Sequence, residues 1–169
     1  SGDRKPYLFK TEDYGKTWIK IVNGIHQEHF TRAIRADKSL KGLLYAGTEE
    51  GMYISYNAGA NWYPFQLNLP IVPVTDICLK NEQLMVSTQG RGLWIVDDLN
   101  PVRVAQSMPA KNYIVAPKPV IRAYGPNMDK PISSNNNHPD AIMLYTYIDS
   151  MSQNDSAQFT VINDNRDTV

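Results

Sequence analysis

The sequence predicts an all-β chain, and two observations lead to that expectation. Short apolar segments recur throughout residues 7–98, and each is bounded by Gly, Asn, Asp or Ser. One motif also occurs twice, about 44 residues apart, a spacing typical of a four-stranded repeat unit. Hydrophobic residues make up 42% of the 169 residues, which is enough to form a packed core.

The repeated motif reads [ST]-x-[DN]-x-G-x-x-W. Its defining residues are Thr11, Asp13, Gly15 and Trp18 in the first copy, and Ser55, Asn57, Gly59 and Trp62 in the second. An apolar strand enters each copy and another leaves it, so a hairpin turn must lie between them. We expect the Asp or Asn to accept bonds from backbone amides two residues on, and the Gly to supply a positive φ. The Trp should return into the apolar layer, so all eight residues are predicted to be structural.

The strands expected in order are residues 7–9, 18–21, 29–36, 43–48, 52–55, 62–65, 74–79, 84–88 and 93–96. Four consecutive antiparallel strands between residues 30 and 66 correspond to one blade of a β-propeller. Residues 1–98 therefore predict a partial propeller of about two and a half four-stranded blades. The third motif has decayed at residues 97–101, which lack the Gly and the Trp, as expected of a terminal repeat.

The rest of the chain predicts a linker over residues 99–119, which is rich in proline, and a second β-domain over residues 120–169. Strands are expected at 120–124, 141–148 and 158–162. Propellers have at least four blades, and each blade buries its faces against its neighbours. We therefore expect the remaining blades to lie upstream in a longer chain or in another polypeptide.

Residues 7–98 resemble the BNR (Asp-box) repeats of sialidases, xyloglucanase-type glycosidases and the sortilin ectodomain. Segments 7–11, 41–49 and 88–99 resemble most closely the end of the propeller in large exported bacterial BNR proteins, often labelled glycosyl hydrolases. In that group an Ig-like β-domain follows, and its opening resembles residues 137–143. The resemblance implies part of an Ig-like β-sandwich at 120–169 and a secreted, periplasmic or cell-surface location. It also implies that Asp-boxes lie at blade edges, away from an axial site.

Candidate ligand-binding residues lie on the two predicted inner strands, which would line the axial channel. These residues are Arg32, Arg35 and Asp76. Because the two arginines are three positions apart, they cannot both point the same way on a regular strand. The glycosidases that the chain resembles use an Arg cluster with a Tyr–Glu pair, or paired carboxylates. The sequence assigns neither set, so we name no catalytic residue.

No metal site or cofactor is predicted. The His26 and His29 pair departs from His-Glu-x-x-His and precedes a strand, so both are expected to be loop residues. The single cysteine, Cys78, lies in an apolar run and is expected to be buried.

The charge balance, with 17 basic and 17 acidic residues, offers no electrostatic basis for binding nucleic acid. No apolar run approaches the ~18 residues of a membrane span. The leading hypothesis is a non-catalytic module that binds a polypeptide or glycan. One alternative is part of a glycoside hydrolase whose carboxylates lie on blades absent from this chain, and another is a purely structural role in a surface complex.

Overall fold

The computed structural model describes residues 2–107, 112–119, 143–150, 152, 155–163 and 165–168. Its regular structure is mostly strand in small antiparallel sheets, which confirms the all-β prediction. The chain divides into two compact parts, Ser1–Ser107 and Met108–Val169. The predicted domain boundaries at 98/99 and 119/120 stay predictions.

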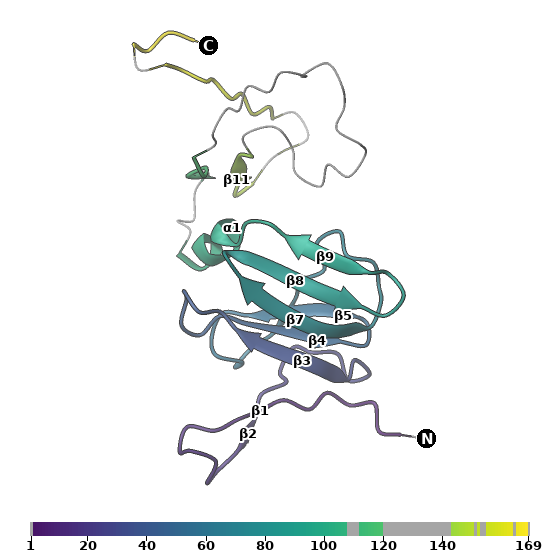
Figure 1. Cartoon of the computed structure of the whole chain (residues 1–169). Helices are drawn as coiled ribbons and strands as arrows, with labels where there is room; N and C mark the ends of the chain where they lie inside the picture. Colours follow the sequence, from purple (N-terminus) through teal and green to yellow (C-terminus); the bar gives the residue numbers. More distant parts are fainter. Residues whose placement is uncertain are drawn as a thin grey trace. The chain divides into compact units, whose positions relative to one another are not determined.

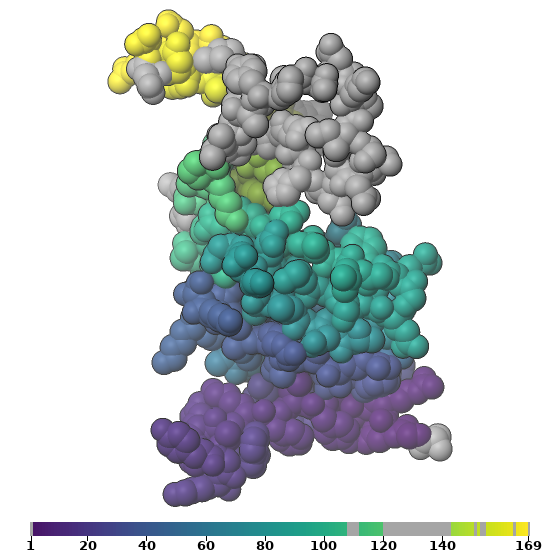
Figure 2. All heavy atoms as spheres, in the orientation of Figure 1, coloured from purple at the N-terminus to yellow at the C-terminus, as the bar shows by residue number. Residues whose placement is uncertain are grey.

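The first part, Ser1–Ser107, holds three successive antiparallel sheets, which we call the first, second and third repeat units. Its strands are β1 (Phe9–Lys10), β2 (Ile19–Lys20), β3 (Thr31–Ala36), β4 (Leu44–Thr48), β5 (Gly51–Ser55), β6 (Tyr63–Pro64), β7 (Val74–Lys80), β8 (Gln83–Thr88) and β9 (Leu93–Val96). They pair as the hairpin β1–β2, the four-stranded sheet β3–β4–β5–β6 and the three-stranded sheet β7–β8–β9. The sheets follow one another as layers (Figure 1), and Figure 2 shows them as consecutive bands of colour. The four strands expected between residues 30 and 66 are confirmed, whereas their place in a propeller stays a prediction.

Neighbouring layers cover both faces of the middle sheet, so its side chains point into two apolar cores. One face packs against the third sheet in a core of Leu43, Tyr45, Met52, Ile54, Leu69, Val74, Ile77, Leu84, Val86 and Leu99. The other face packs against the first hairpin and the segment that follows it, in a core of Leu8, Ile25, Ala46, Tyr53 and Trp62. Every residue of β5 is consequently buried.

The first strands of the second and third sheets share an irregularity. The pairing register shifts at Arg32 in β3 and at Thr75 in β7. Each is an extra residue opposite the neighbouring strand, as in a β-bulge. The regular alternation assumed for Arg32 and Arg35 therefore does not hold along β3.

Cys78 is exposed, so the prediction that it is buried is wrong. Side chains of β7 alternate between two faces, and Ile77 takes the core side with 1% exposure. Cys78 consequently lies on the opposite face, where it remains exposed.

The predicted linker begins with regular structure. Helix α1 (Asn100–Val104) and a 3₁₀ turn (Ala105–Ser107) follow the third sheet. Arg103 of α1 donates from Nε to both carboxylate oxygens of Asp37 at 3.1 Å and also pairs with Glu82. Ion pairs thus hold the start of this segment against the second and third sheets.

The second part, Met108–Val169, contains β10 (Tyr113–Val115) paired antiparallel with β11 (Tyr145–Tyr147). β11 falls inside the strand expected at 141–148, whereas the strand expected at 158–162 is reduced to a single bridge from Ile162 to Thr168. The strand expected at 120–124 lies outside the described residues. The Ig-like assignment stays a prediction.

Candidate functional site

The first copy of the motif forms a turn closed by its own side chains. Thr11 Oγ1 accepts a bond from the Gly15 amide at 2.8 Å, and Asp13 Oδ1 accepts one from the Thr17 amide at 2.8 Å. Gly15 has φ 89°, as predicted. The hydroxyl also accepts the Asp13 amide two residues on, at 3.3 Å. The Asp13 carboxylate thus accepts the amide of Thr17, four residues further on, whereas the sequence predicted an amide two residues on.

The second copy repeats these bonds. Ser55 Oγ accepts from the Gly59 amide at 2.9 Å, and Asn57 Oδ1 accepts from the Asn61 amide at 2.8 Å. Gly59 has φ 86°. Two different pairs of side chains thus build the same turn, which shows that the pattern has a shared local cause.

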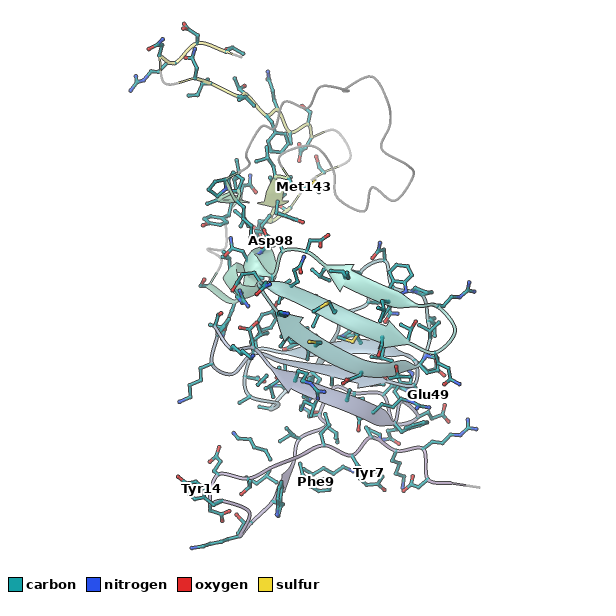
Figure 3. The ribbon with its side chains drawn as sticks, viewed as in Figure 1. Tyr7, Phe9, Tyr14, Glu49, Asp98 and Met143 are labelled. Carbon is teal, nitrogen blue, oxygen red and sulfur yellow. The ribbon has the colours of Figure 1, made fainter. Side chains whose placement is uncertain are left out.

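The two Trp residues differ in their surroundings. Trp62 is 2% exposed, and its indole N–H donates to the Ile21 carbonyl at 2.8 Å. Trp18 is 60% exposed and donates only within its own turn, to the Gly15 carbonyl at 3.1 Å. Burial is therefore confirmed for Trp62 and wrong for Trp18. The reason is that a preceding hairpin covers Trp62, whereas Trp18 belongs to the first hairpin of the described chain, where Figure 3 labels Phe9 and Tyr14.

The structure brings Arg35 and Asp76 together across two sheets. Arg35 Nη2 donates to Asp76 Oδ1 at 2.7 Å, which links β3 to β7. The two side chains are 46% and 61% exposed, so the pair faces solvent. It joins the first strands of neighbouring sheets.

Arg32 pairs instead with Glu49, in the turn between β4 and β5. Its Nε donates to Glu49 Oε2 at 2.5 Å, and both side chains are about one-third exposed. Glu49 is labelled in Figure 3. We refer to the two ion pairs that β3 makes, Arg32–Glu49 and Arg35–Asp76, as the charge row.

Polar side chains near the charge row escaped the sequence reasoning. The Tyr53 hydroxyl lies 2.9 Å from His29 Nδ1, and the Thr75 and Ser87 hydroxyls are 2.8 Å apart. Thr75 occupies the β7 bulge, and no local sequence signal marks that bulge. The Thr75 and Ser87 hydroxyls therefore form an exposed pair next to Asp76, whereas Tyr53 is 6% exposed.

The chemistry of the charge row fits recognition better than hydrolysis. A glycosidase holds two carboxylates on either side of one glycosidic bond. Here Glu49 and Asp76 each accept bonds from a separate arginine. Within the described ranges, no group of three or more His, Cys, Asp or Glu could hold a metal ion. None of the helices in the described part is long and apolar enough to cross a membrane.

No protein-family model matches the chain, and no curated protein matches it.

Proposed function

We propose that the chain is a non-catalytic binding module of an exported Asp-box repeat protein with a β-propeller scaffold. In this proposal the charge row binds a polypeptide or glycan partner. The observation that carries it is the exposed Arg35–Asp76 pair, which joins the first strands of two successive sheets. Bulges on those strands turn further polar side chains toward solvent.

The propeller scaffold is supported by the two uncovered ends of the three-sheet stack. At one end Phe9, Trp18 and Ile19 are 50%, 60% and 57% exposed, and at the other Leu93 and Ile95 are 75% and 51% exposed. Soluble proteins seldom leave such apolar groups together in water. Further repeat units, from the parent chain or from another polypeptide, would cover both ends. The Ig-like domain and the extracytoplasmic location belong to the same proposal and rest on the resemblance.

A binding role follows from what the charge row offers. Arginine presents several fixed N–H donors, and only some are used in each ion pair. Solvent-exposed ion pairs contribute little to stability, typically ~0–1 kcal/mol, so their arrangement is available for recognition. Hydroxyl-rich glycans and peptide backbones both need such mixed donors and acceptors.

The test measures both ligand binding and sugar cleavage by the same chain. The full chain is titrated calorimetrically with sialyllactose, xyloglucan oligosaccharides and a library of unstructured peptides, and each sugar is assayed for newly released reducing ends. Saturable binding without sugar release is expected, and the Arg35→Ala/Asp76→Ala double variant should bind at least tenfold more weakly. Lys16→Ala, an exposed charge on the first hairpin, is the matched control and should bind normally. Unchanged binding by the double variant would remove the charge row from the proposal, and reducing-end release would show that the chain carries catalytic carboxylates of its own.

A further inference from the structure

β5 and β9 hold the same position in successive sheets. Each follows a hairpin closed by one threonine: Thr48 Oγ1 donates to the Gly51 carbonyl at 3.0 Å, and Thr88 Oγ1 donates to the Gly92 carbonyl at 2.8 Å. Each strand is the third of its sheet. Contacts of β5 therefore indicate what β9 would need.

The outer edge of β5 is paired, whereas that of β9 has no partner strand among the described residues. The Phe65 amide donates to the Met52 carbonyl at 2.9 Å, and β6 continues this pairing opposite Ile54. The counterparts of Met52 and Ile54 are Leu93 and Ile95, and no strand in the described ranges pairs with them on this edge. An open strand edge presents unpaired N–H and C=O groups to a further strand.

The chain leaves the repeat pattern immediately after β9. The Leu99 amide donates to the Glu82 carbonyl at 3.0 Å, matching the bond from Ala58 to Gly42 in the second unit. Beyond this point the chain enters α1, near Asp98 in Figure 3. Counted along the sequence from the hairpin, Arg103 occupies the position that Trp62 has in the second repeat unit. Within the described residues, the third repeat unit thus has neither a fourth strand nor the Trp of the motif.

A hollow marks the place of that missing Trp. In the second unit, Trp62 lies among Leu8, Ile25, Ala46 and Tyr53, and donates to the Ile21 carbonyl. One unit later, the same positions are held by Met52, Leu69, Val86, Trp94 and Phe65. All five line one hollow, which also borders Ile95 and Val96 of β9. The repeat therefore places an apolar socket beside an open strand edge.

The socket is partly closed. Its volume is about 30 Å³, close to one water molecule, and full entry of an indole ring requires flanking side chains to move. Leu67 and Ile95 border the hollow at 65% and 51% exposure, so both have room to rotate.

One difference between the units limits how a strand enters the socket. A Cβ on Gly24 would lie 2.2 Å from the Trp62 carbonyl oxygen, and the residue one unit later is Asn68, which carries a Cβ. An added strand must therefore stay clear of this turn and rely on the edge of β9.

We propose that the β9 edge and this socket together bind an extended strand of another polypeptide. The strand pairs antiparallel with β9 and inserts a tryptophan between Val86, Trp94 and Leu69. Its indole N–H donates to the Phe65 carbonyl, as Trp62 does to Ile21 one unit earlier. Backbone pairing supplies affinity, and the socket supplies specificity. This site is separate from the charge row and does not depend on the role proposed for it.

The probe is a blocked synthetic peptide with the sequence of residues 60–66, Ala-Asn-Trp-Tyr-Pro-Phe-Gln, added to the full chain. Binding is monitored by nuclear magnetic resonance and is expected to saturate. The bound peptide should slow hydrogen exchange at the Ile95 amide at least tenfold. The same peptide with Trp replaced by Ala should bind at least tenfold more weakly. Equal binding of the two peptides, or no saturation at millimolar concentration, overturns the proposal.

Ile95→Pro tests the edge itself. The bond from the Thr88 amide to the Gly92 carbonyl at 3.1 Å sets the alternation along β9, so the Ile95 N–H points away from β8. Proline at this position removes the outward N–H but breaks no hydrogen bond to β8, and strand edges tolerate such a proline. We expect the variant to keep its melting profile and to lose measurable peptide binding. Lys16→Ala, an exposed charge on the first hairpin, is the control and should bind the peptide as the parent does.

Two results would assign the edge to a different occupant and overturn the proposal. One is an Ile95 amide already protected before peptide is added, which would place a segment of the chain itself on β9. The other is self-association that Ile95→Pro abolishes, which would make the occupant a second copy. If Ile95→Pro fails to fold, the comparison of the two peptides still decides.

Discussion

The two Asp-box turns have the same internal bonds but different surroundings. Thr11 and Ser55 accept equivalent amides, yet Trp18 is 60% exposed and Trp62 is 2% exposed. The motif therefore determines the turn, and the neighbouring unit determines whether the Trp is buried. An Asp-box alone shows where a hairpin lies but not that its Trp lies in a core.

The third unit extends the comparison. It keeps the threonine hairpin and the bulge of the second unit, but replaces the Trp by Arg103, whose partner Asp37 is fully buried. An ion pair to the preceding sheet thus anchors this segment, where the second unit uses an aromatic ring. In the part of the chain that the structure describes, the third repeat unit therefore keeps an unfilled socket and a β9 edge with no partner strand.

Trp62→Ala gives the largest expected effect. Truncating a buried tryptophan should lower the free energy of unfolding by about 3–5 kcal/mol, because a cavity replaces the indole. Trp18→Ala is the matched control and should cost about 1 kcal/mol or less, since much of its ring already contacts water. Urea unfolding of both variants checks the difference, and equal losses would show that Trp18 is covered in solution.

The buried and exposed ion pairs provide the second comparison. Asp37 accepts bonds from Arg103 and from the Ser39 and Leu40 amides, and its side chain is 0% exposed. Asp37→Asn should cost about 3 kcal/mol, because Arg103 then loses its buried counter-charge. Asp76→Asn should cost about 0–1 kcal/mol, since Arg35 stays solvated. Thermal and urea denaturation measure both, and a small loss at Asp37 would show that water reaches that carboxylate.

Replacing the two motif glycines should give a smaller difference in the free energy of unfolding. Both have positive φ, so replacement by Ala costs roughly 1 kcal/mol at either site. At Gly59 a Cβ would also lie 2.5 Å from Ile21 Cδ1, whereas at Gly15 the nearest atom is 3.8 Å away. Gly59→Ala should therefore lose about 1 kcal/mol more in urea unfolding. Matching losses would indicate that the Ile21 side chain moves aside freely.

The sequence predicted the parts of the molecule that have local causes. The turn at Asn57 and the strands around it follow from side-chain spacing over a few residues. The contact from Arg103 to Asp37 joins positions 66 residues apart, and no repeated sequence pattern indicates it. The bulge at Arg32 depends on the register against β4, which a single strand does not encode. For the same reason the candidate residues Arg35 and Asp76 could be named, but their pairing could not.

The smallest expected effect separates the two turns by acidity. Hydrogen bonds from the Thr17 hydroxyl and amide, and from the Thr11 hydroxyl, lower the pKa of Asp13 from 3.8 to about 2. Because the folded pKa lies below the unfolded one, the stabilisation is complete above about pH 4 and is lost as the pH falls toward 2. The second turn has Asn57, which does not ionise in this range. The Thr17 amide signal should therefore titrate with a midpoint near pH 2 while the Asn61 amide stays constant, and Asp13→Asn should abolish the titration. A midpoint near 3.8 would mean that the first turn, without a covering neighbour, does not hold its bonds in solution.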